Sequence, residues 1–143
     1  MEAKLASLRA LWDAKRQERA MPSRDDFGIH ELKPWLGHLA LLDVAGERTF
    51  RLCGTNLSAR FGGDMTGCRV AEVIAALRQG VTEQVAKACE TKTPVAVKNY
   101  IPVRGQQVIY SELILPLSQD GEEVSMLLWA SYPTPENAGH PSS

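Results

Sequence analysis

Cysteine and histidine are the residue types with the widest chemical range, and this chain has three of each. Cys53, Cys68 and Cys89 are odd in number and lie far apart, with no Cys-x-x-Cys pair. A structural zinc site needs closely spaced pairs of ligands, and a disulfide framework needs an even number of cysteines. The sequence therefore predicts no metal site and three reduced thiols.

Nucleophilic catalysis needs a serine or cysteine beside a histidine that a third side chain orients. His30 and His38 precede or begin the first predicted strand, and no helical or strand spacing brings a carboxylate and a nucleophile to them. We interpret both as structural histidines with satisfied hydrogen bonds. The acidic pairs at 25–26 and 122–123 lie in a turn and a hairpin, away from each other in the sequence. We predict no catalytic residues and no enzyme activity.

Charge and hydropathy exclude two further classes of protein. The formal net charge is −1, so the chain lacks the positive field of a nucleic-acid-binding domain, and we predict no nucleic-acid partner. Purely apolar runs such as 39–42 and 126–130 are far shorter than the ~20 residues that cross a bilayer. Charges are scattered through residues 1–24, where an export signal would need an apolar stretch, so we expect a cytoplasmic protein without a membrane span.

The first element predicted from the sequence is an amphipathic helix. Leu5, Leu8, Leu11 and Trp12 follow helical spacing, and the pattern runs to about residue 20, before Met21-Pro22. Such a stripe is buried either on the free face of a sheet or on a second subunit. We predict a homodimer with these four side chains at the interface.

The remaining elements predict an α+β fold. An apolar hairpin comes first, a helical region follows, and three more strands joined by turns complete the pattern. Because a two-stranded hairpin is marginal alone, we expect all strands to form one five-stranded antiparallel sheet with the central helices on one face. The predicted strands are 39–44, 49–53, 95–103, 107–117 and 124–132, and the predicted helical segments are 55–62, 70–77 and 81–89. The predicted units are an N-terminal helix at 1–20, one domain at 21–132 and a disordered tail at 133–143.

This order of elements, together with particular residues, resembles a PAS domain. The stretch GTNLSARFG at 54–62 is similar to the PAS segment in which a turn leads into a short helix ending in Phe-Gly. MPSRDD at 21–26, HLALLDV at 38–44 and LPLSQDG at 115–121 look like the stand-alone PAS proteins of alphaproteobacteria. The likeness covers about residues 8–132. Gly37 and Phe27-Gly28 depart from the residues that the stand-alone PAS proteins usually have at these positions. The likeness implies a five-stranded PAS sheet, a sensory role and a concave interior for a ligand.

The resemblance raises the question of a haem or flavin cofactor, and the residues present favour neither. Haem-binding members carry a histidine on the helix before the third strand, and 81–93 has none. The run Gly67-Cys68-Arg69-Val70 partly resembles the cysteine motif of light-sensing members, but the asparagine and glutamine pattern that holds the flavin ring is missing. We predict that Cys68 is an ordinary helix-start residue and that the protein binds no cofactor.

Strand alternation suggests where a small ligand could bind. Alternation places Val97 and Asn99 on one face of the third strand, and Ser111 and Leu113 on one face of the fourth. If both are inner faces, two polar groups lie among apolar neighbours, as in a ligand pocket. A β-bulge or local hydrogen bonding would undo this arrangement. With Cys53 added from the PAS likeness and Arg69 expected at the mouth, the predicted ligand-binding residues are Cys53, Arg69, Val97, Asn99, Ser111 and Leu113.

The sequence therefore favours a non-catalytic sensory or signalling module that binds a small ligand, a partner signalling protein, or both. Two alternatives stay open at this stage. One is a small-molecule enzyme of another α+β cone fold, and the other is a structural adaptor whose interior binds nothing. A chain with no output domain of its own would pass its signal through a partner or through changed dimerisation.

Overall fold

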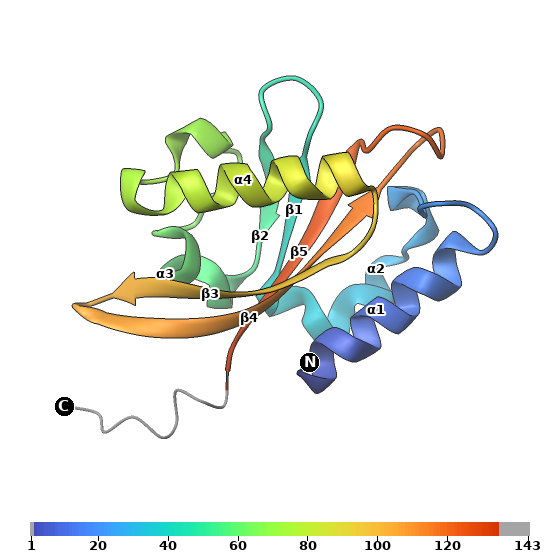
Figure 1. The fold of residues 1–143 in the computed structure, drawn as a ribbon. Helices are drawn as coiled ribbons and strands as arrows, with labels where there is room; N and C mark the ends of the chain where they lie inside the picture. Colours follow the sequence, from blue (N-terminus) through green and yellow to red (C-terminus); the bar gives the residue numbers. More distant parts are fainter. Residues whose placement is uncertain (1, 135–143) are drawn as a thin grey trace.

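The structure, a computed structural model, describes residues 2–134. Its centre is one sheet of five antiparallel strands in the order β2-β1-β5-β4-β3. The predicted joining of hairpin and meander is confirmed, because the last strand lies beside the first. The strands are β1 Leu39–Asp43, β2 Phe50–Cys53, β3 Val95–Val103, β4 Gln106–Leu117 and β5 Met126–Pro133 (Figure 1). Strand β5 thus extends one residue into the predicted tail, and 135–143 lie outside the described residues.

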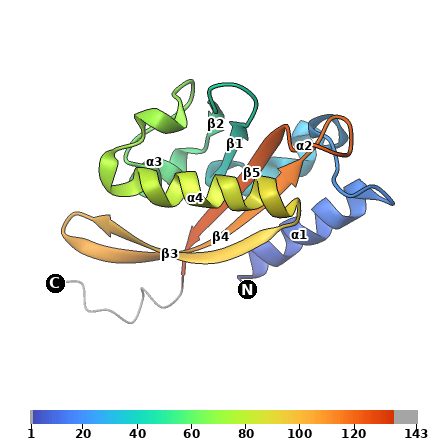
Figure 2. The same ribbon diagram turned by 45° about the horizontal axis from the view of Figure 1, so that its top comes forward.

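Helices cover both faces of this sheet. The longest helix, α4, lies on one side, and α1 and α2 lie on the opposite side (Figures 1 and 2). We call the side under α3 and α4 the inner face and the side under α1 and α2 the outer face. The helices are α1 Ala3–Arg16, α2 Ile29–Leu32, α3 Ser58–Phe61 and α4 Ala75–Thr91, with 3-10 turns at Arg24–Asp26, Lys33–His38, Thr55–Leu57 and Val70–Glu72.

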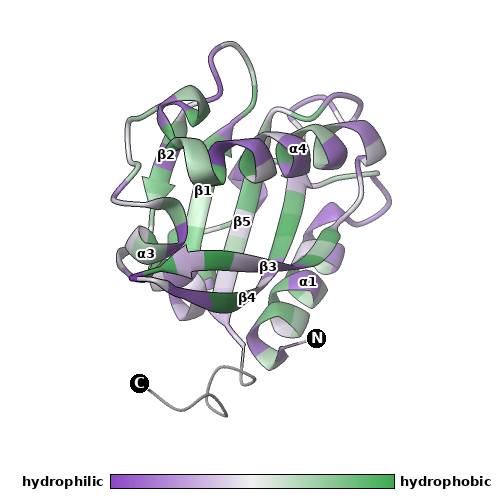
Figure 3. Cartoon of the chain, turned by 60° about the vertical axis from the view of Figure 1, so that its left-hand side comes forward, coloured by the Kyte–Doolittle hydropathy of each residue, from purple (hydrophilic) through white to green (hydrophobic). Residues whose placement is uncertain are grey.

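Each face of the sheet has its own apolar core. The central strands β1 and β5 are mostly hydrophobic, which fits strands that are covered on both sides (Figure 3). Inner-face residues such as Phe50, Phe61 and Trp129 form one buried cluster. Outer-face residues such as Leu39 and Leu113 form the other cluster with α1. The fold therefore has three layers, with the sheet in the middle.

Helix α1 packs on the sheet of its own chain. Leu5, Leu8 and Trp12 are buried there, and Leu11 is partly buried against the same cluster. The Trp12 indole Nε1–H donates to the Pro116 carbonyl at 2.8 Å. Of the two ways to bury the stripe, the structure therefore has the first, on the free face of the sheet. An interface through these residues would need α1 to leave the sheet, so a homodimer stays a prediction that calls for another surface.

Two helix boundaries differ from those expected. Helix α1 ends at Arg16 instead of near residue 20. The next residue, Gln17, has a φ of 56°, which lies outside the right-handed helical region and so ends the helix. The helical pattern at 70–77 is split into a 3-10 turn and the start of α4, and Ile74 between them is half exposed. Ser23 and Asp26 form a capping box around the 3-10 turn Arg24–Asp26.

Candidate functional site

The predicted pairing of Asn99 with Ser111 in one pocket is wrong. In the β3–β4 ladder, Asn99 lies opposite Tyr110, and Ser111 lies opposite Lys98. Residues directly opposite in an antiparallel pair share a face, so odd-numbered residues of β3 share a face with even-numbered residues of β4. Asn99 therefore belongs to the inner face and Ser111 to the outer face. Strand alternation was identified correctly for each strand, but the register between the strands could not be read from it.

The other predicted ligand residues are also dispersed. Val97 is on the inner face, whereas Leu113 is fully buried in the outer-face cluster under α1. Arg69 is about half exposed in a loop, with its guanidinium 3.6 Å from Glu72. Cys53 is buried at the end of β2, where burial raises the pKa of its thiol. The structure thus brings Val97 and Asn99 to one side of the sheet and leaves the predicted six-residue site divided.

The inner face holds instead a buried ion pair that the sequence reasoning missed. Arg60 of α3 and Glu112 of β4 have side chains 2% and 0% exposed. Arg60 Nε donates to Glu112 Oε2 at 2.5 Å, and its Nη2 donates to Oε1 at 2.9 Å. This is a bidentate pair, the strongest geometry open to a guanidinium and a carboxylate. The Arg60 guanidinium also lies 4.8 Å from the centre of the Phe61 ring and 5.5 Å from that of Trp129.

Three more polar side chains complete this network. The Ser131 hydroxyl of β5 donates to Glu112 Oε2 at 2.5 Å, and the Asn99 amide of β3 donates to Oε1. Asn99 and Gln84 of α4 exchange hydrogen bonds at 2.7 and 3.1 Å. The Glu112 carboxylate therefore receives donors from a helix and two strands, which compensates the cost of burying its charge. We call Arg60, Gln84, Asn99, Glu112 and Ser131 the inner network.

Only part of the inner network carried a signal in the sequence. Asn99 was noticed as a polar residue among apolar strand neighbours, and that observation holds. Arg60 sits one position before Phe61 in a short helix, where a charged residue ordinarily indicates a solvated face. Glu112 follows a serine in a strand of alternating character. Nothing local shows that α3 turns Arg60 toward the sheet, since that depends on packing between distant segments.

His38 extends the polar contacts to the start of β1. Its Nδ1 lies 3.0 Å from the Ser131 carbonyl oxygen, and its Nε2 lies 3.1 Å from the Asn56 amide nitrogen. Both contacts are satisfied by the neutral tautomer in which Nδ1–H donates and Nε2 accepts. The ring also stacks on Tyr132, with centroids 4.1 Å apart. The prediction of a structural histidine is confirmed for His38.

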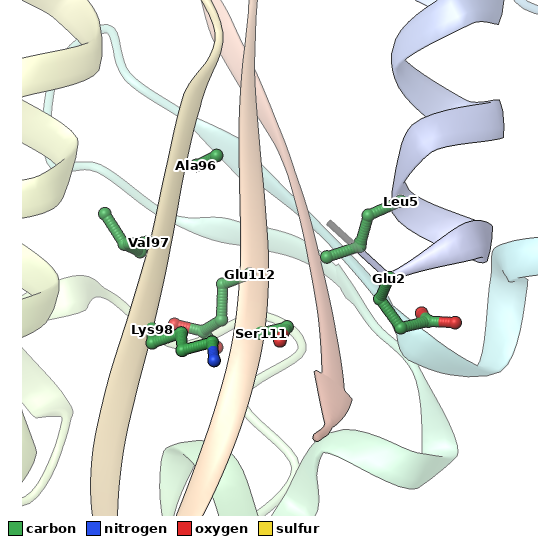
Figure 4. Close-up of a pocket in the computed structure, with 7 residues that line it drawn as sticks. All are labelled: Glu2, Leu5, Ala96, Val97, Lys98, Ser111 and Glu112. Carbon is green, nitrogen blue, oxygen red and sulfur yellow. The ribbon is translucent and has the colours of Figure 1, made fainter. Parts of the chain in front are cut away.

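A surface pocket of about 270 Å³ lies beside the N-terminus of α1. Glu2, which precedes α1, and Leu5 of α1 line it together with Ala96, Val97 and Lys98 of β3 and Ser111 and Glu112 of β4 (Figure 4). Part of the Glu2 carboxylate and the Tyr132 hydroxyl are buried without a hydrogen-bond partner in residues 2–134. The pKa of Tyr132 is raised mainly by burial of its hydroxyl and to a smaller extent by the negative charge of Glu2. Val97 and Ser111, two of the six predicted ligand residues, therefore line one pocket with Glu112, whereas Asn99 is not among its lining residues.

Neither a metal centre nor a membrane segment is found in the part of the chain that the structure describes. Residues 2–134 contain no group of three or more His, Cys, Asp or Glu side chains placed to hold a metal ion. None of the helices in this range combines the length and hydropathy that spanning a bilayer requires.

Comparisons with solved structures found the same fold in PAS and LOV domains. The PAS domain of BvgS from Bordetella pertussis superposes with a TM-score of 0.54 at 14% identity, covering 96% of this chain and 90% of that one. A PAS domain from Colwellia psychrerythraea gives 0.52 at 12% identity, covering 75% and 96%. The LOV domain of the blue-light activated histidine kinase EL346 from Erythrobacter litoralis gives 0.50 at 16%, covering 67% and 94%. At such low identities these likenesses concern the fold alone.

A comparison with curated proteins found no match. The model of one protein family, described as a PAS domain, matches residues 1–130. This match includes α1, strands β1 to β4 and the first part of β5. The finer likeness to alphaproteobacterial single-domain proteins stays a prediction. Because the family model covers most of the chain and the sheet has the PAS arrangement, the chain belongs to the PAS domain family.

Proposed function

We propose that this PAS domain is a non-catalytic signalling module that recognises its partners on its surface and not in its interior. The observation that carries the proposal is the inner network. In this network Glu112 takes the donors of Arg60, Asn99 and Ser131, so these polar groups are already used within the chain. A ligand placed there would have to replace hydrogen bonds that the protein now makes to itself.

The network also offers a way to pass a signal. It joins α3, α4, β3, β4 and β5 through side-chain hydrogen bonds and one ion pair. A partner that favours a shifted position of α4 would act on the Gln84–Asn99 contact and, through it, on Glu112. The free energy of this shift is limited by the difference in the partner's binding free energy for the two positions of α4. A homodimer or a separate signalling protein would serve equally as that partner.

A second candidate function is the binding of a small ligand against the inner face. It is favoured by Trp129, whose indole N–H is buried with no hydrogen-bond partner within residues 2–134. A buried donor of this kind is where an unseen acceptor would bind. Under this candidate, Asn99→Ala would weaken ligand retention, whereas under the first it would only loosen the fold.

Mass spectrometry and sedimentation of the full chain test the proposal. We expect the native mass to equal one or two chain masses with no additional small molecule, and we expect a colourless protein. Sedimentation over a range of concentrations distinguishes the two kinds of partner. Self-association indicates a second copy of the chain, and a monomer indicates a separate signalling protein. A small molecule present in the native sample, lost from the denatured one and weakened in retention by Asn99→Ala would favour the second candidate. A visible absorbance band that survives gel filtration would contradict the expected absence of haem and flavin.

A further inference from the structure

A second pocket, of about 310 Å³, opens on the outer face beyond α1. It lies over strands β1, β2 and β5, with α2 and the turn at Lys33–His38 on its other side. Its lining is mainly leucine and isoleucine, with two arginines: Arg24, Ile29, Leu32, Leu36, Leu39, Leu41, Arg51, Leu52 and Leu128. Its volume is at the small end of the ~300–1,000 Å³ typical of small-molecule sites.

The walls of this outer pocket expose more apolar surface than the fold requires. Ile29 is 70% exposed and Leu36 is 38% exposed, whereas Leu39 and Leu128 beneath them are fully buried. The apolar floor is therefore continued up to the surface by uncovered side chains. Covering Ile29 and Leu36 with an apolar ligand would remove this surface from water, which favours binding.

A β-bulge in β2 completes the pocket. Leu42 pairs with Phe50 and Leu41 pairs with Leu52, so Arg51 is the extra residue. The bulge reverses the alternation, so Phe50 joins the inner cluster and Leu52 joins the outer one. Leu52 thereby faces the pocket, and Arg51 comes to its mouth, where Asp43 pairs with it at 2.8 Å. A regular strand would have turned Leu52 away from this pocket.

The charge at the mouth is incompletely balanced. Arg24 is half-buried, and its guanidinium donates to the Phe27 carbonyl at 3.1 Å. Within residues 2–134 no carboxylate forms an ion pair with Arg24, in contrast to Arg51 and Asp43. A guanidinium has five N–H donors in a planar fork that matches a carboxylate. Arg24 is therefore a cation suited to an anionic group that enters with an apolar body.

We propose that the outer pocket binds a small apolar monocarboxylate, its hydrocarbon body against the leucines and its carboxylate on Arg24. A single negative charge matches Arg24, the arginine of this pocket that has no ion pair within residues 2–134, and a multiply charged ligand would leave charges uncompensated against the leucines. The inference rests on the proposed function only in placing recognition outside the inner face.

Calorimetric titration of the full chain with three eight-carbon probes tests this site. Octanoate supplies the carboxylate, 1-octanol is its neutral counterpart, and octylamine carries the opposite charge. We expect saturable binding of octanoate, weaker binding of 1-octanol and still weaker binding of octylamine. Arg24→Gln should weaken octanoate binding roughly tenfold to hundredfold, the equivalent of one charge-assisted hydrogen bond, and leave 1-octanol unchanged.

Two matched controls separate the pocket from general effects. Arg9→Gln removes a charge from the exposed side of α1 and should leave octanoate binding unchanged. Leu36→Trp should fill the pocket and abolish binding of both octanoate and 1-octanol. Ile74→Trp, which enlarges an exposed apolar residue elsewhere, should change neither. Circular dichroism of each variant shows whether the fold is retained.

Three outcomes would overturn the inference. Octanoate fails to saturate the protein at millimolar concentration, or octylamine binds as well as octanoate, or Arg24→Gln has no more effect than Arg9→Gln. A fourth result would assign the pocket to a second copy of the chain: a dimer that Leu36→Trp dissociates and that does not bind octanoate. The three outcomes that overturn the inference concern only octanoate, octylamine and Arg24, so they leave unchanged the search for a small molecule at the inner face and the colour of the protein, which test the proposed function.

Discussion

The two faces of one sheet are stabilised by different physical means. On the inner face, an ion pair between Arg60 and Glu112 is fully buried, and neighbouring amides and a hydroxyl satisfy it. On the outer face, leucines pack against α1, and the Trp12 indole donates a hydrogen bond to the Pro116 carbonyl. The inner face therefore depends on polar side chains that pair with one another, so the loss of one member destabilises the others. The outer face depends on buried apolar area, and the stabilising contributions of its residues are nearly additive.

The strongest test of this difference is to break the ion pair on one side. Glu112→Leu leaves the Arg60 guanidinium buried without its carboxylate, and we expect the free energy of unfolding to fall by about 3–5 kcal/mol. Urea denaturation measures this loss. The double variant Arg60→Met with Glu112→Leu should recover much of it, because both charges are removed together. Equal losses in the single and double variants would show that the pair has no mutual dependence.

Removing apolar area from the outer face should have a similar or smaller effect. Leu8→Ala deletes a fully buried side chain of α1 and should lower the free energy of unfolding by about 2–5 kcal/mol, according to how far the cavity closes. The same denaturation experiment measures it. Combining Leu8→Ala with Glu112→Leu should give nearly additive losses if the two faces are independent. A large deviation from additivity would mean that the sheet couples them.

A smaller effect is expected from the indole hydrogen bond of α1. Trp12→Phe keeps most of the apolar ring but leaves the Pro116 carbonyl without its donor, and should cost about 1–3 kcal/mol. Trp35→Phe is the matched comparison, because the Trp35 Nε1–H donates at 2.7 Å to the Lys4 carbonyl at a less buried position. We expect the second variant to lose less stability. The opposite order would assign the docking of α1 to Trp35.

The smallest effect concerns a charge that belongs to neither face. The pKa of Asp120 is lowered from 3.8 to about 2. The main cause is hydrogen bonds from the backbone N–H groups of Glu123 and Glu122, and the Ser118 hydroxyl contributes less. Because the pKa is lower in the folded state, this stabilisation is present above pH 3.8 and is lost as the pH falls through about 2. Asp120→Asn should therefore lower the urea midpoint near neutral pH, and the difference from the natural chain should disappear in strong acid. Glu122→Gln in the same loop is the control, and a difference that persists in acid would contradict the assignment to the Asp120 charge.

Local patterns were sufficient for the elements and their order. The helical stripe of α1, the αL glycine at Gly62 that ends α3 and the Asp120-Gly121 turn each act over a few residues. Because these signals depend only on nearby sequence, the strands and their order along the chain were predicted correctly, whereas the PAS arrangement was implied by the family resemblance. The end of α1 and the break before α4 were less well predicted, since element boundaries depend on packing as well as on propensity.

The candidate sites could not be predicted in the same way. The β3–β4 register separates Asn99 from Ser111, the bulge in β2 moves Leu52 to the outer face, and α3 turns Arg60 inward to Glu112. Each of these facts joins residues from different elements. The sequence by itself determined the alternation and spacing within each element, because those follow from bond geometry. Only the tertiary structure decided which side chains meet, because a shift of one residue in register moves every side chain to the opposite face.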